Sequence, residues 1–129
     1  MTRFVVDGMN VIGARPDGWW RDRDAAVRRL LARLQHAAAR SGDEMTLVVD
    51  GRPLADLPEG MHRGVTVHYA RRHGRDAADD RIVELVQDDD VGTLCVVTSD
   101  RALTERVAAA GAGTEPAGAF LRRLDRLGA

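Results

Sequence analysis

Hydrophobic residues are arranged along the chain in short runs that alternate with longer segments of helical periodicity. Four runs rich in β-branched residues predict strands at residues 4–6, 46–49, 65–69 and 94–98, and a short fifth strand is expected near residues 113–115. Three of the four runs are continuous rather than alternating, which is typical of strands buried on both faces of a sheet.

The segments between these runs predict helices. In residues 23–40, hydrophobic side chains recur at three- and four-residue spacing, from Val27 to Leu34, while arginines occupy the other face. Further helices are expected over residues 77–87, from Asp100 to a glycine cap at Gly111, and after Pro116. Strands alternating with helices predict an α/β fold, namely a three-layer α/β/α sandwich around a central, mostly parallel sheet of four to five strands.

Length and composition indicate a globular chain. We expect residues 1–129 to form one domain, with 44% hydrophobic and 30% charged residues. No hydrophobic run approaches the roughly 18 residues of a membrane-spanning helix, and the N-terminal residues lack the pattern of a signal peptide. The expected location is therefore the cytoplasm, without membrane association.

The basic residues exclude several kinds of chemistry. All 19 are arginine and none is lysine, so Schiff-base chemistry and a P-loop lysine are impossible. The two serines are Ser41 and Ser99, and neither lies in a Gly-x-Ser-x-Gly nucleophile motif.

Acidic residues follow the predicted strands. Asp7 ends the first strand, Asp50 follows the second, and Asp100 follows the fourth by two residues. In a parallel sheet these ends lie on one edge, where ligands bind at the point at which the strand order reverses. Gly8 is expected to let the backbone turn tightly after Asp7.

A second acidic group opens the helix predicted at residues 77–87. Asp76 and Asp79 are three residues apart and therefore share one side of its first turn, with Asp80 beside them. Carboxylates this close raise one another's pKa unless a cation lies between them. Mg²⁺ or Mn²⁺, which prefer oxygen ligands, are the natural counter-ions, so the pattern predicts a metal site.

Each of these aspartates also has a purely structural interpretation. Asp76 and Asp100 are suitable helix N-caps, Asp50 is suited to an Asp-Gly turn, and Asp79 and Asp80 complement a helix dipole. Together, however, their positions on one edge favour the metal site.

Two neutral residues fit the same edge. Asn10 is suited to orienting a carboxylate or a metal-bound water without adding charge, or to a turn. Ser99 is suited to donating its hydroxyl to a metal-bound water or a phosphate, or to capping the third predicted helix.

Three segments together resemble the NYN domains of the PIN-like nuclease superfamily, particularly the YacP-like branch. They are DGMN at residues 7–10, DAAD at residues 76–79 and VVTSDR at residues 96–101, in the family's order along nearly the whole chain. The resemblance implies a compact α/β/α fold and a metal-dependent endoribonuclease.

The resemblance also assigns roles to single residues. It implies that Asp7, Asp79 and Asp100 bind metal, that Asn10 is the accompanying polar residue, and that Asp76 is a further acid, where the family often has glutamate. Asp50 and Asp80 are possible additional acids. Two cations about 4 Å apart would then support hydrolysis that leaves 5′-phosphate and 3′-hydroxyl ends.

Basic and aromatic residues near these acids predict contacts with RNA. Arg71, Arg72 and Arg75 precede the acidic helix start and are suited to holding phosphates, although a solvated basic loop is the alternative. Arg101 follows Asp100 in the third of the motif segments. Trp19 and Trp20 are expected either to stack on unpaired bases or, for one of them, to fill the core under their loop.

Two other functional classes remain open from the sequence. One is a non-catalytic RNA-binding or ribosome-associated module that retains the fold. The other is a small-molecule phosphatase, although such enzymes usually carry an Asp-x-Asp pair after the first strand and position 9 is methionine.

Overall fold

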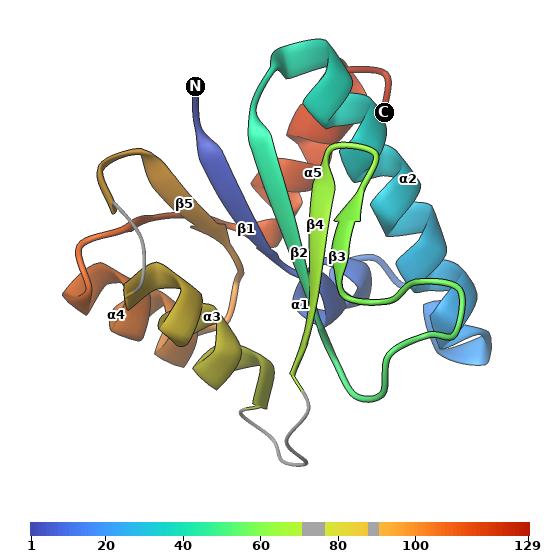
Figure 1. The fold of residues 1–129 in the computed structure, drawn as a ribbon, viewed down its shortest axis with the longest axis horizontal. Coiled ribbons are helices and arrows are strands. Elements are labelled where there is room, and N and C mark those ends of the chain that lie inside the picture. The colour runs from blue at the N-terminus through green and yellow to red at the C-terminus, as the bar shows by residue number, and fades with distance from the viewer. Residues whose placement is uncertain (71–76, 88–90) are drawn as a thin grey trace.

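The fold is built around a six-stranded sheet (Figure 1). The structure, a computed structural model, describes residues 1–70, 77–87 and 91–129. The strands are β1 (Arg3–Asp7), β2 (Glu44–Asp50), β3 (Gly60–His62), β4 (Val65–Ala70), β5 (Leu94–Val97) and β6 (Gly113–Glu115). Their order is β3-β4-β2-β1-β5-β6, and all neighbours are parallel except β3, which pairs antiparallel with β4.

Helices cover both faces of this sheet, as Figure 1 shows. They are α1 (Gly8–Gly13), α2 (Arg23–Ser41), α3 (Ala77–Gln87), α4 (Arg101–Ala109) and α5 (Ala117–Arg126), with short 3₁₀ turns η1 (Trp19–Arg21) and η2 (Val91–Thr93). The α2 and α5 helices pack on one face, and α3 and α4 pack on the other. The predicted three-layer α/β/α architecture is therefore confirmed.

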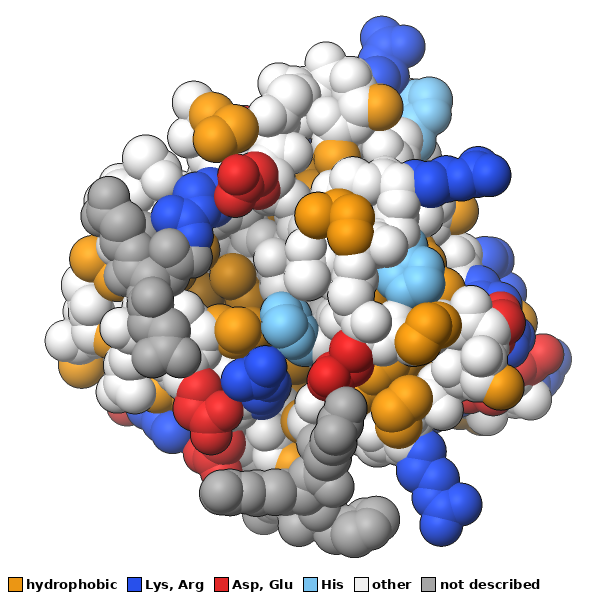
Figure 2. All heavy atoms as spheres, viewed as in Figure 1, with side chains coloured by type: hydrophobic (Ala, Val, Ile, Leu, Met, Phe, Trp, Pro, Cys, Tyr) orange, Lys and Arg blue, Asp and Glu red, His pale blue; other side chains and the backbone are white. Residues whose placement is uncertain are grey.

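The hydrophobic core consists of two clusters, one on each face of the sheet. Leu34 of α2 and Phe120 of α5 belong to the first, whereas Ile82 of α3 and Leu103 of α4 belong to the second. All four side chains are fully buried. Neighbouring residues of the central strands enter opposite clusters, which explains why their hydrophobic runs are continuous. On the outer surface seen in Figure 2, hydrophobic side chains are interspersed with charged and polar ones.

The prediction of four to five strands missed one strand, the edge strand β3. The strand near residues 113–115 is present, as expected, as β6. In contrast, β3 consists of Gly60, Met61 and His62, none of which is buried, and Met61 is 69% exposed. A strand that contributes no buried side chain leaves no hydrophobic run in the sequence.

The short helix α1 was not predicted either, and it changes the explanation for Gly8. The chain passes from β1 directly into α1, but the φ angle of Gly8 lies outside the left-handed region. A Cβ atom at Gly8 would lie 2.8 Å from the Val48 carbonyl oxygen and 3.0 Å from Leu47 Cδ1. Glycine is therefore needed because α1 starts directly against β2.

Gly8→Ala should destabilise the fold by about 1–3 kcal/mol, because the added methyl group forces α1 away from β2. The matched control is Gly13→Ala at the other end of α1, where the nearest atom to an added Cβ is 4.0 Å away. Urea unfolding of both variants measures the difference. Equal free energies of unfolding for the two variants would contradict the steric explanation.

Candidate active site at the carboxyl edge of the sheet

The candidate site lies where the strand order reverses. From β1 the chain continues to β2 and β4 on one side, whereas β5 and β6 lie on the other side of β1. All five of these strands are parallel, so their carboxyl ends share one edge. Val6 is paired with Val97 on the neighbouring strand, so Asp7 and Thr98, the next residues along each chain segment, lie level with each other.

Asp7 is held by a short hydrogen-bond relay. Its side chain is buried, with the residue 6% exposed, and the Thr98 hydroxyl donates to Asp7 Oδ2 over 2.9 Å. The same Thr98 oxygen accepts from the Asp100 backbone N–H over 3.1 Å. Because the oxygen of Thr98 is occupied by this N–H, its proton is directed at Asp7, and the carboxylate has a fixed orientation.

Burial raises the pKa of Asp7 to about 6. Desolvation of the carboxylate is the main cause, and the charges of Asp79, Asp100 and Asp50 raise the pKa further. The Thr98 hydrogen bond acts in the opposite direction. Three acids that are far apart in the sequence thus act on one buried carboxylate: Asp50 and Asp100 follow strands, and Asp79 lies in the first turn of α3.

Asp100 has two roles at this edge. It is the N-cap of α4, with Oδ1 accepting from the Leu103 N–H over 3.0 Å, so its structural interpretation as a cap is confirmed. The cap uses one carboxylate oxygen, and the negative charge still raises the pKa of Asp7. Capping therefore fixes the position of Asp100 without neutralising it.

Asn10 and Ser99 tie the elements around the site together. Asn10 Oδ1 accepts from the Ser99 backbone N–H over 2.8 Å, which fastens α1 to the segment after β5. Ser99 Oγ accepts from the Ala117 N–H over 2.9 Å at the start of α5. The expectation that Ser99 caps the third predicted helix is wrong, because Asp100 is the N-cap of α4.

The other described acids differ in their surroundings. Asp50 is bound by Arg23, which also donates to the Asp50 backbone carbonyl, and Asp80 pairs with Arg106 over 3.0 Å. Asp79 is half-buried in the first turn of α3, and its charge raises the pKa of Asp7. Asp50 and Asp80 are thus each paired with an arginine.

The described donors fit a hard divalent cation whose coordination is completed by water or substrate oxygens. Among residues 1–70, 77–87 and 91–129, no three His, Cys, Asp or Glu side chains come close enough to hold a metal ion by themselves. Mg²⁺, however, usually binds through one or two carboxylates together with waters and substrate phosphates. The buried, negatively surrounded Asp7 matches that kind of site.

The remaining predicted residues have different placements. Asp76, Arg71, Arg72 and Arg75 lie outside the described residues. Arg101 is exposed at the start of α4 and lines a shallow hollow of about 310 Å³ together with Thr98 and other residues.

Trp19 and Trp20 pack edge to face, with ring centroids 6.0 Å apart. Trp20 is 57% exposed and Trp19 is half-buried, and neither belongs to the two core clusters. The interpretation that one of them fills the core is therefore wrong, and base stacking stays a prediction.

Thr98 and Arg23 were missed by the sequence analysis. Thr98 is 2% exposed and makes the only hydrogen bond that the described part of the structure gives the Asp7 side chain. Its signal was a hydroxyl directly after a buried run on a strand parallel to β1. Arg23 could not be found in this way, because its pairing with Asp50 depends on where α2 begins in space.

A mostly parallel α/β/α fold with acids at its carboxyl edge agrees with the family that the sequence resembles. The sequence matches the YacP-like NYN domain over residues 4–129, and the chain belongs to this family. NYN domains form part of the PIN-like nuclease superfamily, which supports a nuclease acting on RNA.

The structural relatives agree with this assignment. The chain is similar to the crystal structure of Rae1 (YacP) from Bacillus subtilis, with 27% identity and a TM-score of 0.76 over 98% of this chain and 75% of that one. The W164L mutant of Rae1 gives 26% identity and a TM-score of 0.80 over 98% and 77%. A comparison with curated proteins gives no significant match. Among the helices that the structure describes, none has the length and hydrophobicity to cross a membrane.

In the absence of divalent cations, Asp7→Asn should stabilise the protein at pH 8. Because the pKa of Asp7 is raised to about 6, the native state binds more protons than the unfolded state between about pH 4 and pH 6. Stability therefore falls as pH rises through this window, by up to about 3 kcal/mol. Urea unfolding in EDTA should show a more stable variant at pH 8 and no difference below about pH 4.

Asp56→Asn is the control for this experiment. Asp56 is exposed and its pKa is lowered by its hydrogen bonds with Arg28, so its removal should not stabilise the protein at pH 8. A wild-type protein as stable at pH 8 as Asp7→Asn would show that the buried carboxylate is not under electrostatic stress.

Proposed function

We propose that this protein is a metal-dependent endoribonuclease that hydrolyses RNA phosphodiester bonds at the carboxyl edge of the sheet. The observation that carries the proposal is the buried Asp7 carboxylate, oriented by Thr98 and placed within the electrostatic influence of Asp79 and Asp100. Membership of a PIN-like nuclease family supports the same reaction class.

The residues that would hold Mg²⁺ or Mn²⁺, directly or through bound water, are Asp7, Asp79 and Asp100, with Asp76 as a further candidate ligand from the family motif. Waters and an RNA phosphate oxygen would complete the coordination. A cation bound there would supply an activated water and offset the charge that develops on the leaving 3′ oxygen. The expected products carry 5′-phosphate and 3′-hydroxyl ends.

The chain itself provides orientation and charge. The relay from Asp100 N–H through Thr98 to Asp7 fixes the carboxylate, so it is aligned before substrate binds. The hydrogen bond from the Ser99 N–H to Asn10 holds the segment after β5 against α1. At neutral pH Asp7 is mostly ionised, because its pKa of about 6 lies below 7.

Cationic side chains around the acids are proposed to hold the flanking phosphates. Arg101 follows Asp100 directly in the sequence and is exposed in the hollow that Thr98 and Ser99 also line, which supports this role. Arg71, Arg72 and Arg75 are proposed for the same role from their position in the sequence.

Purified protein should cleave RNA in the presence of Mn²⁺ or Mg²⁺, and EDTA should abolish cleavage. Asp7→Asn and Asp79→Asn should each lower the rate at least about a hundredfold, because each removes a negative ligand from the site. Gel analysis of single-stranded, duplex and ribosome-bound RNA measures the rate and the preferred substrate.

Asp56→Asn serves as the matched control. Asp56 is an exposed aspartate that pairs with Arg28 of α2 and is not among the acids that act on Asp7. It should retain wild-type activity. Full activity of Asp7→Asn and Asp79→Asn would reject the mechanism. Metal-independent binding of RNA without cleavage would instead favour a non-catalytic RNA-binding module.

A further inference from the structure

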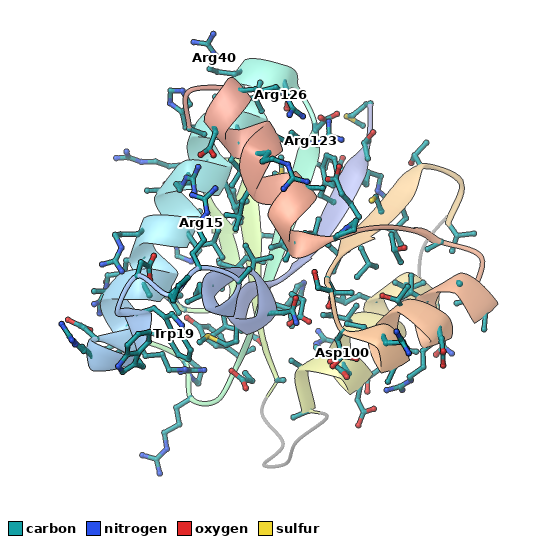
Figure 3. The ribbon with its side chains drawn as sticks, turned by 180° about the vertical axis from the view of Figure 1, so that it is seen from behind. Arg15, Trp19, Arg40, Asp100, Arg123 and Arg126 are labelled. Carbon is teal, nitrogen blue, oxygen red and sulfur yellow. The ribbon has the colours of Figure 1, made fainter. Side chains whose placement is uncertain are left out.

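A second hollow lies on the other side of α1, between α1, η1, α2 and α5. Its volume is about 180 Å³. In Figure 3, Arg15 projects between α2 and α5, and Trp19 lies on the opposite side of α1 from Asp100. The hollow is smaller than the roughly 300 Å³ of pockets that enclose drug-sized ligands, which limits an occupant to about one planar ring system.

The floor of this hollow is hydrophobic and its rim is cationic. Val11 and Leu30 are buried beneath it, with Trp19 on its wall. Three guanidinium groups, from Arg15, Arg29 and Arg33, line it together with one carboxylate, Asp17. Asp17 Oδ1 accepts from the Trp19 backbone N–H over 3.2 Å, so this acid fixes the turn that carries Trp19.

The arginines of the hollow differ in how they are held. Asp125 binds both Arg15, over 3.0 Å, and Arg33, over 2.7 Å, which fixes these two guanidinium groups. Arg29 is exposed, and no hydrogen bond or ion pair joins it to another residue in the part of the chain that the structure describes. The hollow thus combines an aromatic wall, two fixed cations and one cation that is available to an anion.

We propose that this hollow is a subsite for one unpaired nucleotide of an RNA strand. The base lies against Trp19 and the hydrophobic floor, and Arg29 contacts a phosphate of the same strand. The charge of the lining favours an anionic ligand, and the aromatic wall favours a planar one, which together match a nucleotide. The proposal rests on the proposed function, which supplies RNA as the ligand.

The position of the subsite fits a strand that also reaches the acids. Asp7 and Asn10 face the acidic edge from the start of α1, whereas Val11 and Ile12 of the same helix line the hollow. Asp7 and Ile12 are about 8 Å apart along the axis at 1.5 Å per residue. A nucleotide held here therefore positions a nearby phosphodiester of the same strand at the acids, and duplex RNA, whose bases are paired, cannot use the subsite.

The test is binding of a short fluorescein-labelled oligoadenylate in EDTA, measured by fluorescence anisotropy. Trp19→Leu should weaken binding at least about fivefold, because it removes a stacking surface. Arg29→Gln should also weaken binding and should reduce the salt dependence by about one phosphate contact. An abasic strand of the same length separates the two effects, since Trp19→Leu should leave its affinity unchanged while Arg29→Gln weakens it.

Arg40→Gln is the matched control for Arg29→Gln. Arg40 is an exposed arginine of the same helix, and Figure 3 shows it at the far end of α2 from Trp19. Its replacement should leave oligoadenylate binding within about twofold of wild type.

The subsite is rejected if wild-type protein does not bind oligoadenylate, if Trp19→Leu binds it as wild type does, or if Arg29→Gln binds it no more weakly than Arg40→Gln. Because EDTA prevents metal-dependent cleavage, this outcome is independent of the nuclease assay. Binding with the expected pattern by a protein that never cleaves RNA would retain the subsite and reject the proposed activity.

Discussion

The hydrogen bond from Thr98 to the buried Asp7 carboxylate is the interaction on which the site depends. A carboxylate removed from water is unfavourable unless hydrogen bonds or a cation compensate it. Here the hydroxyl offers partial compensation, while the neighbouring acids oppose it and raise the pKa of Asp7 to about 6. The fold therefore holds a buried carboxylate whose ionised form is destabilised, and a bound cation would stabilise that form.

The parallel sheet positions Asp7 at the end of β1, and two other aspartates are paired with arginine. Strands β1 and β5 bring Asp7 and Thr98 level at the point where the strand order reverses. Asp50 and Asp80 are paired with Arg23 and Arg106, respectively. Within the described residues, Asp7 receives the Thr98 hydrogen bond and the charges of Asp79, Asp100 and Asp50. The charges that act on its carboxylate there are therefore all negative.

Much of this arrangement could be predicted from the sequence, because buried parallel strands and amphipathic helices leave strong periodic patterns. The runs around Val6 and Val97 placed Asp7 and Asp100 on one edge without any knowledge of contacts. The edge strand β3 left no such pattern, since none of its side chains is buried. The helix α1 was also missed, because six residues are too few to establish a helical period.

The details of the site were less accessible for a different reason. Whether Ser99 or Asp100 caps α4, or whether Arg23 reaches Asp50, depends on the spatial path of each connection and not on residue spacing. The difference between the surroundings of Trp19 and Trp20 likewise follows from packing, because of the two only Trp19 lines the hollow beside α1. Sequence patterns predicted that Asp7 and Asp100 share one edge, and the structure adds their hydrogen-bond partners, Thr98 and Leu103.

The most direct test of the account is to measure the pKa of Asp7 by a pH titration monitored with ¹³C NMR of its side-chain carboxyl. Without divalent cations the account predicts a pKa near 6, and added Mg²⁺ should lower it because the cation favours the ionised form. An ordinary pKa near 4, unchanged by Mg²⁺, would contradict the claim that the fold holds Asp7 for a cation.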